Sequence, residues 1–339
     1  MPEQEEKRQE EVAKPKKKGF LGCSFPLFIG LLVISLALFL VGLASGPIGK
    51  SMLRGVNLPA WLSFPQPEPE LPAEVVFHLF GFPITNSIVA TWLTIIVLVG
   101  FSFAVTRRMK LVPGKLQTLL EFTLGSFLLG FCQTVAGKHN GRRFFPIVAT
   151  IFLFVIFNGW LSLLPGFGSI LIESEGHEVH LLRGANTDIN TPLAIAALSF
   201  IFVEFFGLST LGLGYLKKFI NVGQLFVGLG HLAKGKVGAG LNGIFMGIIN
   251  IFIGLIETLS ELVRIISFTL RLFGNMTAGE ILLLMATFLV PFLFALPFYG
   301  LELLVGFIQA LIFASLTLIF LNVAVTSHEH NEHGEAAHK

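Results

Sequence analysis

The chain has 339 residues, of which 53% are hydrophobic and only 13% are charged, and its mean hydropathy is +0.79. So few polar residues cannot cover a soluble globule of this size. The composition therefore excludes a soluble enzyme or binding domain and predicts an all-α, polytopic helical membrane protein. The net charge of +2 gives no reason to expect a nucleic-acid partner, because the lysines and arginines gather in particular loops, where they indicate orientation instead.

The beginning of the chain predicts three segments. Residues 1–18 carry glutamates followed by lysines and no apolar pattern, so they predict a disordered tail, and the lysines at 14–18 place it in the cytoplasm. Residues 19–46 predict an extra N-terminal transmembrane helix, because 25–43 contains no charge and is long enough to span a membrane. Residues 47–85 predict an external linker that its prolines keep extended.

Three more apolar segments are predicted to span the membrane. The charges in the loops between them indicate which end of each span lies on the cytoplasmic side. The spans are 86–105, 146–164 and 192–215. Basic residues at 107–115 and 142–143 predict the cytoplasmic side, and the acidic loop 168–188 predicts the external side. A further segment, 116–135, mixes glutamine and glutamate with apolar residues, so it predicts a helix that either lies at the interface or packs beside the bundle.

Two features lie in and after the span 192–215. Glu204 is in the middle of the span, where a carboxyl is either a proton relay or a group bonded to a neighbouring helix. Residues 223–243 are rich in glycine and carry His231 and two lysines, and they predict an inner loop.

The longest apolar run, 243–290, contains the strongest candidate for a functional residue. As one helix it would be about 70 Å long at about 1.5 Å per residue, over twice the roughly 30 Å of a hydrocarbon core, so it must tilt, break or lie partly along the membrane. Arg271 lies inside this run, and an arginine at membrane depth usually faces a bundle interior, a partner or water. No carboxylate lies three or four residues away, so its partner must come from another helix or another protein.

Other polar residues of this run share a face with Arg271. Glu257, Arg264 and Arg271 are seven apart and therefore form one stripe, with Glu261 and Ser267 beside it. Glu261 and Arg264 are three apart and can form an ion pair, which is either a structural seam or part of a functional path.

The last predicted span is 299–325, which follows a turn at 291–297. Glu302 and Gln309 are seven apart and share a face of this span, so an antiparallel hairpin brings both against the helix that carries Arg271. The presence of Gln309 in an apolar span is explained equally well by a hydrogen bond to a neighbouring helix. Residues 326–339 predict a His-rich cytoplasmic tail that is solvated rather than metal-binding, and no cofactor is expected.

Some of these residues resemble a known signature. The run Leu-Arg-Leu-Phe-Gly-Asn-Met at 270–276, with Glu280 after it, is similar to that of subunit a of the F-type ATP synthase. Gln309, in Gln-Ala-Leu-Ile-Phe, matches a second position of that family on the last helix. The resemblance covers about residues 72–324 and implies a subunit a-like membrane domain at 86–325.

The resemblance implies how such a protein works. The matching arginine is the essential residue of a long, tilted two-helix hairpin, where it faces the carboxylate of a rotating c-ring. Two half-channels couple proton flow across the membrane to rotation of the ring and to ATP synthesis, and the subunit has no catalytic site of its own. The expected proton path contains Asn275, Glu280 and Glu302 toward the outside, Glu257, Glu261 and Ser267 toward the inside, and Gln309 as the second matched position.

The resemblance also implies partners and a location. The partners are the c-ring, b-type peripheral stalk subunits and the remainder of the ATP synthase, in the lipid bilayer of a bacterial cell membrane. Both termini are expected in the cytoplasm.

The chain departs from the family pattern at two places, and two other functions are weighed against the resemblance. Some members have histidine where this chain has Glu302, and the helix 19–46 is additional. A secondary ion transporter often shows an inverted repeat, but the Arg271 segment has no second copy. A purely structural membrane anchor does not explain an arginine, an asparagine, glutamates and a glutamine on two adjoining helices.

Overall fold

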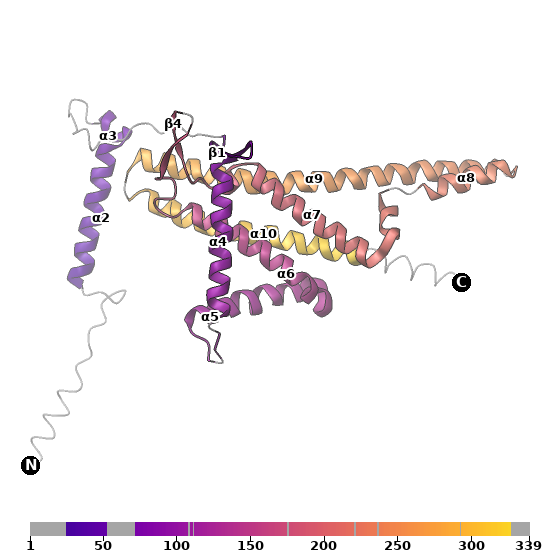
Figure 1. Ribbon diagram of the computed structural model, residues 1–339, viewed down its shortest axis with the longest axis horizontal. Helices are drawn as coiled ribbons and strands as arrows, with labels where there is room; N and C mark the ends of the chain where they lie inside the picture. The colour runs from indigo at the N-terminus through magenta and orange to yellow at the C-terminus, as the bar shows by residue number, and fades with distance from the viewer. Residues whose placement is uncertain are drawn as a thin grey trace, which may run out of the picture. The chain divides into compact units, whose positions relative to one another are not determined.

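The computed structural model describes residues 25–52, 72–107, 109–110, 112–174, 176–219, 222–235, 237–291 and 293–326. The predicted tail 1–18 and almost all of the tail 326–339 lie outside these residues. Figure 1 shows that the described chain is mainly helical, as predicted.

Five helical runs of the described chain are long and apolar enough to cross a membrane, which confirms the prediction of a polytopic helical membrane protein. They are α4 (Asn86–Thr106), the run Lys115–Ser162, α7 (Asn190–Leu211), α9 (Val237–Leu289) and α10 (Ala295–Thr326). Pro297 lies in the first turn of α10, where a missing backbone N–H costs nothing, so the turn after α9 is shorter than the predicted 291–297.

The chain forms two compact units, residues 1–68 with 282–299, and residues 69–281 with 300–339. In the first unit, α2 (Phe25–Ser45) is the helix that the uncharged segment predicts, and the short α3 (Pro47–Met52) follows where the sequence predicts an extended linker. Gly46 separates them and lies so close to the carbonyl oxygen of Leu289 that a Cβ would overlap it. Glycine at this position therefore allows the end of α2 to contact the end of α9.

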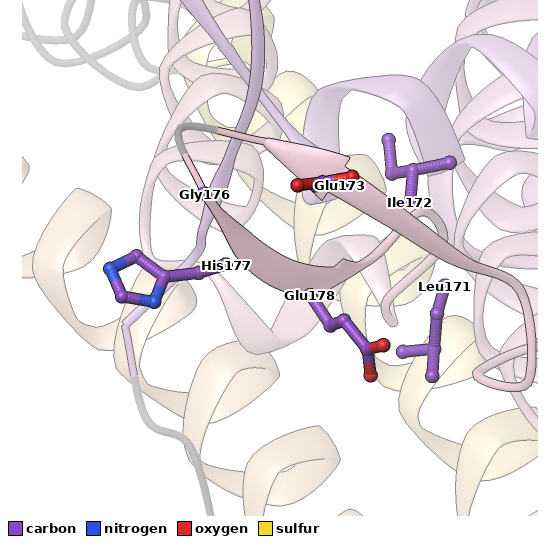
Figure 2. A pocket seen from close by; sticks show the side chains of 6 residues that line it. All are labelled: Leu171, Ile172, Glu173, Gly176, His177 and Glu178. Carbon is purple, nitrogen blue, oxygen red and sulfur yellow. The ribbon is translucent and has the colours of Figure 1, made fainter.

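The second unit contains two short β-hairpins that the sequence analysis does not predict. β1 (Val75–Leu79) pairs with β2 (Phe82–Thr85), and β3 (Leu171–Ser174) pairs with β4 (His177–His180), both antiparallel. The first hairpin turns through Phe80 and Gly81 with φ of 51° and 83°, the positive values that a tight two-residue turn requires. A shallow pocket beside the second hairpin contains none of the candidate site residues, and His177 points away from the strands there (Figure 2).

The core of the second unit is organised around the helix that follows Gly137. α5 (Lys115–Leu120), the π-helix η3 (Glu121–Leu129) and α6 (Gly130–Ser162) form one run, broken where Gly137 has a φ of 76° and a ψ of 167°. After the break, Phe144 meets Phe206 of α7 at 5.3 Å and Phe152 meets Phe307 of α10 at 5.9 Å between ring centroids. Aromatic side chains of α6 thus connect it to both helices.

The segment 116–135 packs beside the bundle, which is one of its two predicted positions. Leu128 and Cys132 are fully buried, and the side chain of Asn322 on α10 donates a hydrogen bond to the carbonyl oxygen of Val135 at 3.3 Å. A helix lying alone at the interface would leave these side chains exposed to lipid or water.

The prediction of a loop at 223–243 is wrong, because the structure forms α8 (Gly223–Ala233) and the first turns of α9 there, and the side of the membrane stays a prediction. A 3-10 helix, η5 (Gly212–Lys218), connects α7 to this region. Glycine weakens isolated helices, which is why the sequence suggests a loop. In the folded chain the same glycines let the two helices touch, and that contact offsets their poor propensity.

Candidate functional site

The antiparallel pairing of α9 and α10 brings the predicted residues together. The amide nitrogen of Asn275 donates a hydrogen bond to the side-chain oxygen of Gln309 at 3.3 Å. About two turns before Asn275, Phe268 contacts Phe313 with ring centroids 4.8 Å apart. The prediction that Glu302 and Gln309 lie against the Arg271 helix is therefore confirmed.

Glu302 fills a space that a glycine leaves on α9. Its carboxylate lies against the α-carbon of Gly279, so that a Cβ on Gly279 would overlap all three carboxylate atoms. Glu302 is only 5% exposed, and it makes no hydrogen bond or ion pair with any residue that the structure describes. A buried carboxyl without a partner is costly, which is typical of a functional group rather than a structural one.

Glu280, the next residue on α9, lies beside a cation that the sequence analysis does not include in the site. The Nε of Arg183 is 3.8 Å from Oε1 of Glu280, and the Arg183 side chain is only 10% exposed. Its Nη1 donates a hydrogen bond to the carbonyl oxygen of Pro72 at 2.7 Å, which fixes the guanidinium. The signal for Arg183 in the sequence was its isolation, as a single arginine in the most acidic loop.

A group of buried polar side chains lies between α4, α6 and η4 (Ala185–Thr187), and the sequence analysis missed it. Asn158 donates a hydrogen bond to Asn186 at 3.1 Å, and Ser87 donates one to Asp188 at 2.7 Å. Both polar atoms of the Asn86 amide are buried and have no partner among the described residues. Buried amides in this position normally bind water, so this region is suited to hold ordered water molecules.

Arg271 differs from every other candidate residue because its side chain faces outward. It is exposed, while Phe268, Leu272 and Met276 of the same helix are buried in the core. It makes no ion pair or hydrogen bond within the part of the chain that the structure describes. This agrees with the expectation that no nearby carboxylate pairs with it.

A second ionic cluster lies on the other side of Arg271 along α9. Nζ of Lys218 is 2.7 Å from Glu257 and 3.2 Å from Glu261, and Nη1 of Arg264 is 2.5 Å from Glu261. The guanidinium of Arg264 also lies 3.6 Å from the ring centroid of Phe320. The predicted pair of Glu261 and Arg264 is confirmed, and Lys218 was the residue that the sequence analysis missed.

Ser267 and Glu204 take no part in the ion pairs of this cluster. Ser267 is exposed, and no contact joins it to the ionic cluster in the described chain. Glu204 accepts a hydrogen bond from the hydroxyl of Tyr215 at 3.2 Å. Burial, followed by the charge of Glu204, raises the pKa of Tyr215, so its hydroxyl keeps the proton that it donates. This geometry favours a carboxyl bonded to a neighbouring segment over a relay.

Together these contacts place carboxyls on both sides of Arg271 along α9. Glu280 follows Arg271 by nine residues and Glu261 precedes it by ten, so each lies about 15 Å away along a helix that rises about 1.5 Å per residue. Carboxyls can take up and release protons, whereas a guanidinium stays charged. No group of three or more metal-ligating residues occurs in the described chain.

Comparisons with known proteins show which family the chain is similar to. A family model described as ATP synthase A chain matches residues 88–322. A protein named ATP synthase subunit a 1 from Pelobacter propionicus is 33% identical over 243 residues, which is 70% of this chain and 86% of that protein. ATP synthase subunit a from Moorella thermoacetica is 30% identical over 254 residues, 75% of this chain and 96% of its own length. The protein of the same name from Gloeobacter violaceus is 29% identical over 244 residues, 72% of this chain and 85% of its own length.

Proposed function

Because the chain belongs to the ATP synthase subunit a family, we propose that the two groups of polar side chains are its two proton access paths and that Arg271 separates them. A subunit a is the proton-translocating stator subunit of the F-type ATP synthase, a multi-pass membrane protein without a catalytic site of its own. Membership of the family sets aside the alternatives of a secondary transporter and a structural anchor.

The external access path contains Glu280, Glu302, Asn275 and Gln309. Its support is the burial of Glu302 against Gly279 and the hydrogen bond between Asn275 and Gln309. The buried amides between α4 and η4 can hold the water that a proton needs to reach these carboxyls. In this path Arg183 positions the carboxylate of Glu280.

The internal access path contains Glu257, Glu261 and Ser267. Lys218 contacts both glutamates, and its positive charge offsets part of the repulsion between their carboxylates. Ser267 lies on the exposed face between this cluster and Arg271, where its hydroxyl can accept and donate a proton. A proton released near Arg271 would leave by this route.

Arg271 is the barrier between the two paths, and its partner is a carboxylate of the c-ring. The observation that carries this proposal is an arginine on the surface of an apolar helix with no partner in the described chain. Its exposed neighbours Ile266 and Leu270 give the ring an apolar surface around the charge. When a ring carboxyl arrives, the guanidinium favours its ionised form and so draws off the proton.

The remaining partners and the orientation follow from the same assignment. A stator must be held still while the ring turns, so we infer that b-type peripheral stalk subunits bind this chain. Its bacterial relatives point to a bacterial cell membrane. The basic loops at 107–115 and 142–143 support a topology with both termini in the cytoplasm.

The test of the barrier is Arg271→Ala in the complete ATP synthase in vesicles. We expect gradient-driven ATP synthesis to stop, because a neutral residue neither discharges the ring carboxyl nor separates the paths. Arg271→Lys should rescue poorly, since an ammonium facing the apolar surface of the ring can lose its proton and lacks the planar fork of a guanidinium. Arg107→Ala is the matched control, because Arg107 is another exposed arginine and its guanidinium lies 5.7 Å from the ring centroid of Phe103. Near-normal synthesis by an intact Arg271→Ala assembly would refute the assignment.

The test of the external path is accessibility. Single cysteines replacing Glu280 and Glu302 should react with a polar thiol reagent added from the outside, because both positions would face the same water. Thiols that stay unreactive at both positions in an assembled complex would argue against the path and leave the Arg271 test unaffected.

A further inference from the structure

The hairpin of α8 and the first turns of α9, residues 223–235 and 237–247, is packed mainly through glycines. Figure 1 shows α8 lying along the beginning of α9. A Cβ on Gly243 would be 2.6 Å from the α-carbon of Gly228, and a Cβ on Gly247 would be 2.7 Å from the α-carbon of Leu225. Distances this short mean that the two backbones touch at these positions, while the side chain of Leu232 lies against Gly240.

The large apolar side chains of this glycine hairpin therefore point outward. Those that are at least half exposed are Phe226, Val227, Leu229, Val237, Leu241 and Phe245. In water such a pair of helices would gain little from burying apolar surface, because most of its large apolar side chains remain exposed. Close packing of small residues with apolar side chains outside is instead the way helices associate in lipid.

The charged residues of the glycine hairpin are all basic and close together in the sequence. Between residues 219 and 256 the sequence contains two lysines, Lys234 and Lys236, and no aspartate or glutamate. Lys234 is exposed beside Gly235, whose φ of 76° makes the turn, and His231 lies one turn earlier on α8. A basic tip with apolar flanks complements an anionic lipid surface.

We propose that the glycine hairpin is an interfacial membrane arm, with its apolar flanks among the acyl chains of one leaflet and Lys234 at the phosphates of anionic headgroups. α9 has 53 residues, about 80 Å at about 1.5 Å per residue, far more than the roughly 30 Å of a hydrocarbon core. Its first turns are thus free to run along the leaflet while the rest of the helix crosses. The exposed apolar surface of α9 continues into the glycine hairpin without a break. Lipid therefore fits both the length of α9 and the positive charge of Lys234.

The experiment places a fluorescent probe on single cysteines in the complete ATP synthase in vesicles. The variants are Phe226→Cys and Phe245→Cys, with His177→Cys on the exposed β3–β4 hairpin as the aqueous reference (Figure 2). We expect lipids with brominated acyl chains to quench both hairpin probes, and dissolved iodide to quench only the reference. Iodide quenching as strong as at residue 177 would overturn the proposal. Protection from both quenchers, with cross-linking to another subunit, would also overturn it.

A second arm of the experiment tests the headgroups. Vesicles of phosphatidylcholine alone are compared with vesicles that also contain phosphatidylglycerol, using the Phe226→Cys probe with and without Lys234→Gln and Lys236→Gln. We expect acyl-chain quenching to rise in the anionic vesicles and the rise to disappear in the lysine variants. Equal quenching in both lipids, with the lysines present, would refute the part of the proposal that concerns anionic headgroups. Neither arm depends on the role of Arg271.

Discussion

Two arginines of the same helical stripe should have opposite consequences when they are replaced. Arg264 pairs with Glu261 and lies over the ring of Phe320, whereas Arg271 has no partner in the described chain. We predict that Arg264→Leu destabilises the folded subunit strongly and that Arg271→Leu leaves its stability nearly unchanged. The substitutions are chemically identical, so each serves as the control for the other.

The expected magnitude follows from the burial of Glu261. Its side chain is only 4% exposed, and without Arg264 it keeps a single cation, Lys218, at 3.2 Å. Removing one member of a buried ion pair costs about 3 to 5 kcal/mol, and we expect about 3 kcal/mol because Arg264 is partly exposed and Lys218 remains. Losing the cation–π contact with Phe320 adds about 1 kcal/mol. Arg271→Leu should stay within about 0.5 kcal/mol, as for an exposed side chain without contacts.

The assay is detergent-induced unfolding of the purified subunit in mixed micelles, followed by circular dichroism. A double variant, Glu261→Leu with Arg264→Leu, should recover more than half of the loss, because removing both charges leaves no buried ion unpaired. Equal destabilisation by the Arg264 and Arg271 variants would refute this reasoning. So would a double variant less stable than Arg264→Leu alone.

Two other predictions concern the access paths. Gly279→Ala should lower gradient-driven ATP synthesis by about tenfold or more, because a methyl group there displaces the carboxylate of Glu302. Gly300→Ala, where an added Cβ meets nothing within 4 Å, should leave the rate unchanged, and equal rates for both variants would contradict the role of this contact. Tyr215→Phe should lower unfolding stability by about 1 kcal/mol, since Glu204 loses its hydrogen-bond donor, while synthesis continues. Loss of synthesis at unchanged stability would identify Glu204 as a proton relay instead.

The sequence by itself determined the membrane helices and the central arginine. Helix α4 begins where its span was predicted, and α7 and α10 begin within a few residues of their predicted positions, because length and hydropathy are properties of a continuous stretch of chain. The isolation of Arg271 and the pairing of Glu261 with Arg264 were also predictable, since residues three or four apart on a helix are neighbours. The spacing of Glu302 and Gln309 predicted their common face in the same way.

The partners of those residues in other elements were decided only by the tertiary structure. Arg183 and Lys218 lie far along the chain from Glu280 and Glu257, and no periodicity relates them. Which side chains meet depends on the rotation and depth of each helix, and these are set by packing of the whole bundle. The same reason explains the glycine hairpin. Glycine is a poor helix former in isolation, and only the contact between α8 and α9 turns the predicted loop into two helices.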